Sequence, residues 1–269
     1  MGIVRKLEGK VAMVTGGGRG LGRAYVLRLA QLGAHVAIND ISLQAHKEYD
    51  EELTAPTVAD EVEALGVKAL PLEADATDAD QVAGMFEQIE DTFGRLDILV
   101  NNAGGVLRGG DRSWASTAPI DDFDFIMDVN LRDTLLCCQG AAAIMKRQRS
   151  GRIVNIGSQA GMHAHIGGSG APYAIAKAAV IQYTRVLAAE LGAYNINVNC
   201  MAPAWILSSR AIAQGRNSDE TRTGLESQIA LGRLGMPEDV AKVLEFLVTD
   251  LSDYVTGQCL SVCGGYVLF

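Results

Sequence analysis

The sequence predicts an α/β fold with a central parallel sheet of about seven strands, doubly wound with helices on both faces. Short apolar runs of strand length alternate with helix-like segments along the whole chain, which is the pattern of βαβ units. A glycine-rich turn directly follows the first run. No linker, repeat or low-complexity tract divides the 269 residues, so we expect one domain over 1–269.

The individual elements follow from where the apolar runs begin and stop. The first run, Val-Ala-Met-Val-Thr, precedes the glycine turn, and the apolar-faced helix after that turn stops at Gly33. The expected strands are 11–15, 35–40, 67–72, 96–100, 152–156, 196–200 and 259–262. The expected helices are 20–32, one ending near Gly66 after the polar stretch 42–57, 78–93, 119–149 with an interruption near Asn130, 173–191 and 238–248.

Composition favours a small-molecule ligand. The net charge of −9 argues against a nucleic-acid or anionic-membrane surface, and no apolar stretch has the ~20 residues that span a bilayer. The first residues lack the apolar run of a signal peptide, so we expect a cytoplasmic protein. The five cysteines form no C-x-x-C pair and are interpreted as packing residues. His163 and His165 have no third ligand at a supporting spacing, and we predict no metal site.

The turn Thr-Gly-Gly-Gly-Arg-Gly-Leu-Gly at 15–22 indicates a dinucleotide site. Gly16, Gly20 and Gly22 lie between the first strand and the first helix, where glycine permits a pyrophosphate to approach backbone N–H groups at a helix N-terminus. Many strand-to-helix turns use glycine only structurally, so the placement carries the argument.

Asp40 ends the second strand, where an acidic side chain holds ribose hydroxyls. A carboxylate there repels a 2′-phosphate, which favours NAD over NADP. Two alternatives remain open: Asp40 only starts a turn, or Arg19 on the glycine turn supports a phosphate.

A tyrosine and a lysine four residues apart, Tyr173 and Lys177, would share one face of a helix. At ~4 Å and an effective dielectric near 20, a cation stabilises a phenolate by roughly 4 kcal/mol. Such a phenol can serve as a general acid or base. The alternative is a half-buried aromatic with a solvated neighbour, and the surrounding motifs must decide between them.

Together the motifs resemble the short-chain dehydrogenase/reductase family, in its single-domain branch, over essentially the full length. That resemblance implies a Rossmann-type fold. The motifs in the family's order and approximate spacing are 15–22, Asp75, 101–104, Asn130, Ser158, Tyr173, Lys177, Pro203 and 232–239.

The resemblance implies four catalytic residues. Tyr173 would exchange a proton with the substrate oxygen, and Ser158 would hydrogen-bond that oxygen. Lys177 would bind the nicotinamide ribose and assist Tyr173, and Asn130 would hold a water that relays the proton. An acid/base group and an oxyanion donor must converge on one atom when hydride leaves a carbinol carbon.

The resemblance also assigns the cofactor contacts. Besides Asp40, Tyr173 and Lys177, they are Gly16, Arg19, Gly20 and Leu21 at the pyrophosphate, Asp75 and Ala76 at adenine, Asn102, Ala103 and Gly104 on the floor, and Pro203, Ile206 and Ser208 at the carboxamide.

Substrate contacts are expected from loops at about 105–118, 159–172 and 204–230, with Ser158, His165, Tyr173 and Trp205 as the proposed residues. The spacing from Ser158 to Tyr173 is longer than the family's usual one, which leaves the substrate more open than the chemistry. A hydroxysteroid-like ring, a sugar or polyol, and an oxoacyl compound are the alternatives. The family further implies a homotetramer, or a dimer, built on the helices after Pro119 and Tyr173.

The sequence therefore predicts an NAD-dependent oxidoreductase acting on a secondary alcohol and its ketone. An NADP-preferring carbonyl or 3-oxoacyl reductase is the alternative within the family. A non-catalytic dinucleotide-sensing protein is the alternative outside catalysis, and retention of Ser158, Tyr173 and Lys177 argues against it.

Overall fold

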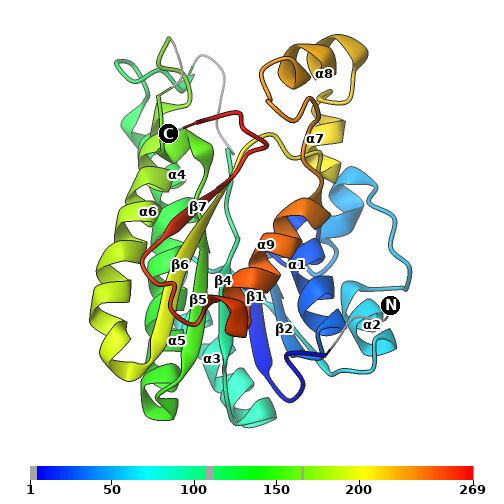
Figure 1. The fold of residues 1–269 in the computed structure, drawn as a ribbon, viewed down its shortest axis with the longest axis vertical. Coiled ribbons are helices and arrows are strands. Elements are labelled where there is room, and N and C mark those ends of the chain that lie inside the picture. The colour runs from blue at the N-terminus through cyan, green and yellow to red at the C-terminus, as the bar shows by residue number, and fades with distance from the viewer. Residues whose placement is uncertain (1–4, 107–111, 165–166, 269) are drawn as a thin grey trace.

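Seven parallel strands form one sheet in the order β3-β2-β1-β4-β5-β6-β7 (Figure 1). The computed structural model describes residues 5–106, 112–164 and 167–268. The strands are β1 Val11–Thr15, β2 His35–Asp40, β3 Ala69–Glu73, β4 Ile98–Asn101, β5 Gly151–Ile156, β6 Ile196–Pro203 and β7 Cys259–Val262. The strand order reverses between β1 and β4, and in open α/β sheets ligands bind beyond the carboxyl ends at such a point.

Helices cover both faces of the sheet. The α-helices are α1 Gly20–Gln31, α2 Val58–Ala64, α3 Ala79–Phe93, α4 Ile120–Met127, α5 Asp133–Gln148, α6 Ala171–Leu191, α7 Ser209–Ala213, α8 Asp219–Glu226 and α9 Pro237–Val248. Figure 1 shows α1, α2 and α9 on one side and α3, α4, α5 and α6 on the other.

Each face has its own hydrophobic core. One cluster joins β1, α1 and α9 through residues such as Val14, Leu29 and Leu244, and the other joins α3 and α5 through Ile89 and Met145. Because both faces are covered, the strands read as continuous apolar runs, which is why they could be recognised in the sequence. The predicted doubly wound α/β class is confirmed.

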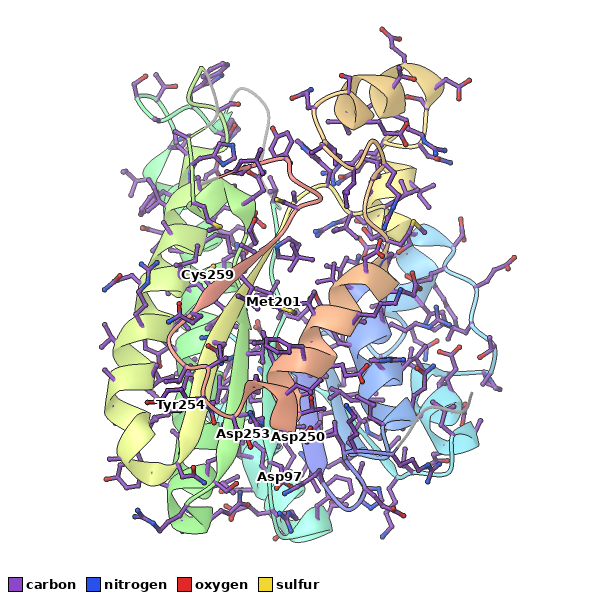
Figure 2. All side chains as sticks on the ribbon, viewed as in Figure 1. Asp97, Met201, Asp250, Asp253, Tyr254 and Cys259 are labelled. Atoms are coloured by element: carbon purple, nitrogen blue, oxygen red, sulfur yellow. The ribbon has the colours of Figure 1, made fainter. Side chains whose placement is uncertain are left out.

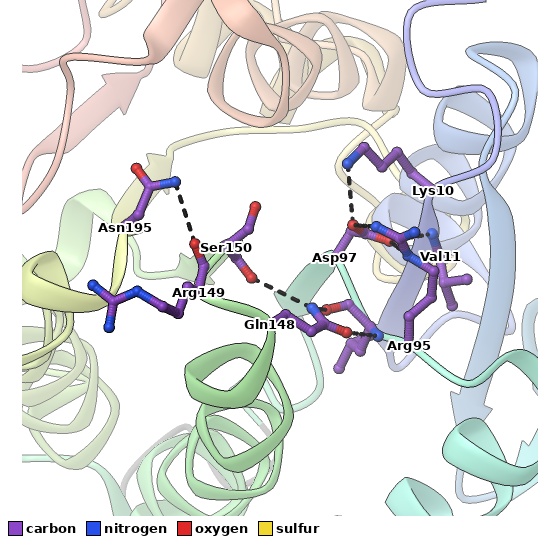
Figure 3. A network of polar contacts seen from close by, with 9 residues as sticks. Lys10, Val11, Arg95, Asp97, Gln148, Arg149, Ser150 and Asn195 are labelled. Atoms are coloured by element: carbon purple, nitrogen blue, oxygen red, sulfur yellow. Dashed lines mark hydrogen bonds and ion pairs between the residues drawn. The ribbon is translucent and has the colours of Figure 1, made fainter.

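Polar contacts join the segments that precede β1 and β4, at the edge of the sheet where the strands begin. Figure 3 shows Lys10 and Arg95 converging on Asp97, at 3.2 and 2.6 Å. In Figure 2 the labelled Asp97 and Asp253 lie toward this lower end of the sheet. A depression of about 250 Å³ lies here, lined in part by Lys10, Asp97 and Arg152, and it contains none of the predicted site residues.

Most predicted elements agree with the structure, and β1, β2 and β7 have the predicted bounds. The helix expected over 119–149 is divided by a π-helical turn, Asp128–Arg132, which contains Asn130 as predicted. The stretch after β6, expected to be loop, holds α7 and α8. No residue of α8 is buried, and its sequence lacks the apolar residues at helical spacing that would predict a helix. A short 3₁₀ helix, Ala45–Tyr49, also lies within the polar stretch 42–57.

Candidate active site

The glycine turn connects β1 to α1 at the carboxyl edge of the sheet and is shaped by close backbone contacts. A Cβ on Gly22 would lie 1.8 Å from the carbonyl oxygen of Gly16, so only glycine fits there. A Cβ on Gly20, by contrast, would meet no atom nearer than Ser208 Cβ, at 3.7 Å. The turn therefore packs tightly against its own helix and leaves space on its outer side, as a pyrophosphate requires.

A carboxylate already lies against this turn. The backbone N–H of Gly20 donates to Glu51 Oε2 at 2.8 Å, and Ser209 Oγ donates to the same oxygen at 2.6 Å. Arg23 Nη1 binds the other oxygen at 3.1 Å. Glu51 belongs to the polar stretch after β2, where no motif marks it as a site residue. Its carboxylate uses an N–H that an anionic ligand would otherwise receive.

Asp40 lies where the sequence predicted, at the carboxyl end of β2. Its Oδ2 accepts the backbone N–H of Gly18 at 3.0 Å, which ties the second strand to the glycine turn. Burial raises the pKa of the Asp40 carboxyl, and the hydrogen bonds from the backbone N–H groups of Gly18 and Ser42 oppose that shift. The carboxylate is thus fixed beside the glycine turn, and its contact with a ribose stays a prediction.

The side chain of Arg19 contacts two residues of the polar stretch after β2. Its guanidinium pairs with Glu48 at 3.3 Å and lies 4.6 Å from the centre of the Tyr49 ring. The Glu48 side chain is mostly exposed, so this ion pair contributes little free energy and leaves Arg19 able to contact a phosphate. The alternative in which Arg19 supports NADP stays open.

The predicted adenine contacts lie just after β3. Asp75 Oδ1 accepts from the backbone N–H and the hydroxyl of Thr77, both at 2.8 Å, which orders the loop before α3. Ala76 is buried against the core. Their contacts with a cofactor stay a prediction.

The predicted cofactor floor follows β4. Thr15 Oγ1 accepts the N–H groups of Asn102 and Ala103, both at 3.0 Å, and the Asn102 amide donates to the carbonyls of Thr15 and Gly16. Gly104 has φ +106°, and a Cβ there would lie 2.4 Å from the carbonyl oxygen of Val129. These bonds join the loops after β1 and β4 at the switch point.

Asn130, which is fully buried in the π-helical turn, supports the next residue of that floor. Its side-chain oxygen accepts from Gly105 N at 2.9 Å, and its amide donates to the carbonyls of Gly105 and Ile126 at 3.1 and 3.0 Å. Both amide hydrogens of the side chain are thereby used, one for Gly105 and one for Ile126. The main-chain carbonyl of Asn130 accepts from Thr134 Oγ1 at 3.4 Å.

The proposed catalytic side chains come together at the carboxyl end of β5. Tyr173 and Lys177 lie one turn apart on α6, with Lys177 Nζ 5.8 Å from the centre of the Tyr173 ring. Lys177 is buried and donates to the carbonyl of Ile156 at 2.9 Å, two residues before Ser158. Ser158 Oγ accepts from Ala160 N at 3.1 Å, which leaves its own proton available. Among the described residues, the Tyr173 hydroxyl has no hydrogen-bond partner.

A buried carboxyl group, that of Asp133, lies close to Lys177. Asp133 begins α5 directly after the π-helical turn and is 3 % exposed. Burial raises the pKa of the Asp133 carboxyl to about 7, against the opposing charge of Lys177 and the backbone hydrogen bond from Thr134. This residue was not predicted, since an Asp at a helix start is common.

The predicted carboxamide residues lie on the segment from β6 into α7. Pro203 ends β6, Ile206 is buried, and Ser208 caps α7 by accepting Ala211 N at 3.3 Å. The contact of Ser208 with the glycine turn places this segment over the same edge of the sheet.

Aromatic rings connect two of the predicted substrate loops. Tyr266, near the C-terminus, makes edge-on contacts with both His163 and Trp205, each with ring centres 6.0 Å apart. These two residues belong to different predicted substrate loops. Tyr266 was not predicted, because nothing in its local sequence marks it. His165, which was predicted, lies outside the described residues.

No helix in the described part of the chain is long and apolar enough to cross a membrane. Within the same residues, no three His, Cys, Asp or Glu side chains gather closely enough to hold a metal ion.

The chain is similar to known proteins over nearly its whole length. A family model described as enoyl-(acyl carrier protein) reductase matches residues 16–267. Cyclohexanol dehydrogenase from Rhodococcus sp. (strain TK6) is 45% identical over 262 residues, which are 96% of each chain. The (2S)-[(R)-hydroxy(phenyl)methyl]succinyl-CoA dehydrogenase subunit BbsD of Thauera aromatica is 42% identical and covers 98% of each chain.

A solved structure of a 3-oxoacyl-[acyl-carrier protein] reductase from Brucella melitensis with bound NAD superimposes with a TM-score of 0.84 at 30% identity, covering 99% of this chain and 95% of that one. The fold, the site and these likenesses define an oxidoreductase of the class acting on CH–OH groups, EC 1.1.1.-. The chain belongs to the short-chain dehydrogenase/reductase family.

Proposed function

We propose that the protein is an NAD-dependent dehydrogenase that interconverts a secondary alcohol and its ketone, with Tyr173 as the acid/base. The observation that carries this proposal is the Tyr173 hydroxyl, which has no partner among the described residues while the ammonium of Lys177 is fixed beside its ring. The Tyr173 side chain is partly exposed, so its hydroxyl is open to a ligand at this edge of the sheet.

Two side chains of the protein act on the oxygen atom of the substrate. Bound NAD supplies the hydride acceptor. Tyr173 Oη takes the proton of the substrate hydroxyl, and Ser158 Oγ donates a hydrogen bond to the same oxygen. Lys177 holds the ribose and stabilises the phenolate by its charge. In the reductive direction Tyr173 returns the proton.

Asn130 contributes to the proposed mechanism by fixing the backbone of Gly105. Because its side chain is committed to Gly105 and Ile126, the relay water expected at this residue would bind the main-chain carbonyl. The π-helical turn contains that carbonyl, and such turns are frequent at functional sites.

Asp40 favours NAD over NADP. The buried carboxylate touches the glycine turn, and a 2′-phosphate at that position would meet a like charge. The pyrophosphate contacts at Gly16, Arg19, Gly20 and Leu21, and the others predicted from the family, belong to this proposal.

The substrate enters between the loops at about 105–118, 159–172 and 204–230, where Trp205 and Tyr266 form one wall. One relative is named for cyclohexanol and another for an acyl-CoA bearing a hydroxyl group, which supports an alcohol or ketone substrate. Exposed Ile120, Ile175 and Val186 on α4 and α6 support a homo-oligomer built on these helices. The cytoplasmic location stays a prediction.

A fluorescence titration with NADH and NADPH, followed by an alcohol panel with the preferred oxidised cofactor, tests the proposal. We expect tighter NADH binding, and loss of roughly 10²- to 10⁴-fold in turnover for Tyr173→Phe with NADH affinity unchanged. Full activity in Tyr173→Phe, or no cofactor reduction on any alcohol by the NAD-saturated protein, would refute it.

A further inference from the structure

Two arginines on the segment after β6, Arg210 and Arg216, have no acidic partner among the residues that the structure describes. Arg210 lies on α7, and its guanidinium rests on Gly105: a Cβ there would lie 2.7 and 2.8 Å from Nη1 and Nη2. Gly105 is held on both its N–H and its carbonyl by Asn130. Arg210 is therefore positioned at the end of the β4 loop, beyond the residues predicted as the cofactor floor.

Arg216 approaches the same space from the aromatic wall. Its guanidinium carbon lies 5.3 Å from the centre of the Trp205 ring, which in turn contacts Tyr266. Burial, followed by the positive charge of Arg210, lowers the pKa of Arg216, whereas the charge of the Tyr173 phenolate acts in the opposite direction. The backbone N–H of Arg216 donates to the carbonyl of Ala211, the residue after Arg210, at 3.0 Å, so the two arginines lie on neighbouring turns of the chain.

Within the described residues, neither Arg210 nor Arg216 forms an ion pair or a hydrogen bond with a carboxylate. This contrasts with Arg23, Arg28 and Arg233, whose guanidinium groups each contact an acidic side chain. In a chain of net charge −9, acidic partners are plentiful. Two partly buried cations that repel each other are unfavourable unless an anion joins them.

We propose that Arg210 and Arg216 bind an anionic group, a carboxylate or a phosphate, carried by the substrate next to its reacting carbinol or carbonyl carbon. This inference rests on the proposed function and specifies its substrate class. A guanidinium offers several N–H donors in a planar fork that matches both groups. The guanidinium of Arg210 rests on Gly105 and that of Arg216 on Trp205, on the side of the predicted substrate loops, which assigns the anion to the substrate and not to the cofactor pyrophosphate.

Matched substrate pairs test the charge requirement. The full chain is assayed with NAD on 3-hydroxybutyrate against its methyl ester, and on 2-hydroxypropyl phosphate against 1-methoxy-2-propanol. We expect at least one anionic member to have a kcat/KM roughly 10- to 100-fold above its neutral partner, the range of a charged hydrogen bond. The two pairs distinguish a carboxylate from a phosphate. Equal use of charged and neutral members would overturn the proposal.

Arg216→Gln and Arg210→Gln should each raise KM for the preferred anion by a similar factor and leave KM for the neutral member and the Kd for NADH within about twofold. Arg222→Gln, which removes an exposed arginine paired with Glu226 on α8, is the matched control and should change neither. Weaker NADH binding with unchanged charge discrimination would assign the arginines to the cofactor and overturn the inference.

A binding measurement separates this inference from the proposed function. In Trp114→Phe, Trp205 is the remaining tryptophan, and its fluorescence reports on Arg216 directly. Acetoacetate, but not acetone, should change that fluorescence in the NAD complex, which holds no hydride to transfer to a ketone, and Arg216→Gln should abolish the response. If the response is present without any turnover, the dehydrogenase proposal fails and the anion site stands. If turnover is present without any charge preference, only the anion site fails.

Discussion

The carboxylate of Glu51 and the backbone N–H of Gly20 are joined by a 2.8 Å hydrogen bond, although the residues are 31 positions apart. Because Gly20 begins α1, the bond places a negative charge at a helix N-terminus where a pyrophosphate is expected. If the cofactor binds at this turn as we propose, Glu51 competes with its pyrophosphate for the Gly20 N–H.

Glu51→Gln should tighten NADH binding by roughly 3- to 30-fold, because an anion at a helix N-terminus contributes up to about 2 kcal/mol. Glutamine keeps the hydrogen bonds of Gly20 and Ser209 while it removes the charge. The Kd from a fluorescence titration measures the effect. The neighbouring exposed Glu52, changed in the same way, should leave the Kd unaltered. A weaker complex for Glu51→Gln would show that the carboxylate assists the cofactor.

Asp40→Asn should move cofactor preference toward NADP. Asparagine can retain the Gly18 contact but removes the charge that opposes a 2′-phosphate. We expect the ratio of the NADPH and NADH dissociation constants to fall by roughly 10-fold or more. An unchanged ratio would place the ribose away from Asp40.

Asp133→Asn should make stability less dependent on pH. The folded-state pKa of Asp133 is about 7, above the ordinary value of about 3.9 for the unfolded chain. The folded form therefore retains its proton between these values, and its stability falls as pH rises from about 4 to 7. Above pH 7 the ionised, buried carboxyl carries its full penalty.

The asparagine variant should thus be more stable than the parent by roughly 2–4 kcal/mol at pH 8 and nearly equal to it at pH 4. Urea unfolding at both pH values measures the difference. Asp128→Asn, at an exposed position in the adjacent π-helical turn, serves as the control. A variant that is less stable at pH 8 would mean that attraction to Lys177 outweighs burial.

Gly22→Ala should destabilise the fold by roughly 2–4 kcal/mol and weaken NADH binding, because its methyl group would collide with the Gly16 carbonyl. Gly84→Ala gives the opposite expectation. A Cβ added to this helical glycine in α3 would meet nothing within 4 Å, and alanine should stabilise the fold by about 0.5–1 kcal/mol. Thermal unfolding of both variants compares them directly.

Much of the fold could be predicted because its signals are local. The strands β1, β2 and β7 are apolar runs with polar or glycine-rich ends, and the helix break near Asn130 was expected at the position of the π-helical turn. The polar helix α8 could not be found, since it buries nothing and owes its position to the loops around it.

The candidate site divides in the same way. The sequence predicted that Tyr173 and Lys177 share a helix face and that Asp40 ends a strand, and the structure has both arrangements. Nothing in the sequence joins Glu51 to Ser209, which is 158 residues away, or Tyr266 to His163 and Trp205.

The sequence by itself determined the fold class, the family and the residues available for proton transfer, because periodicity, glycine placement and a four-residue spacing are properties of short stretches of chain. Only the tertiary structure decided that Glu51 lies on the glycine turn and that, among the described residues, Arg210 and Arg216 lie on Gly105 and Trp205 without an acidic partner. Contacts of this kind form because loops that are distant in the sequence fold over the same edge of the sheet. A short stretch of sequence does not show which loops will lie together.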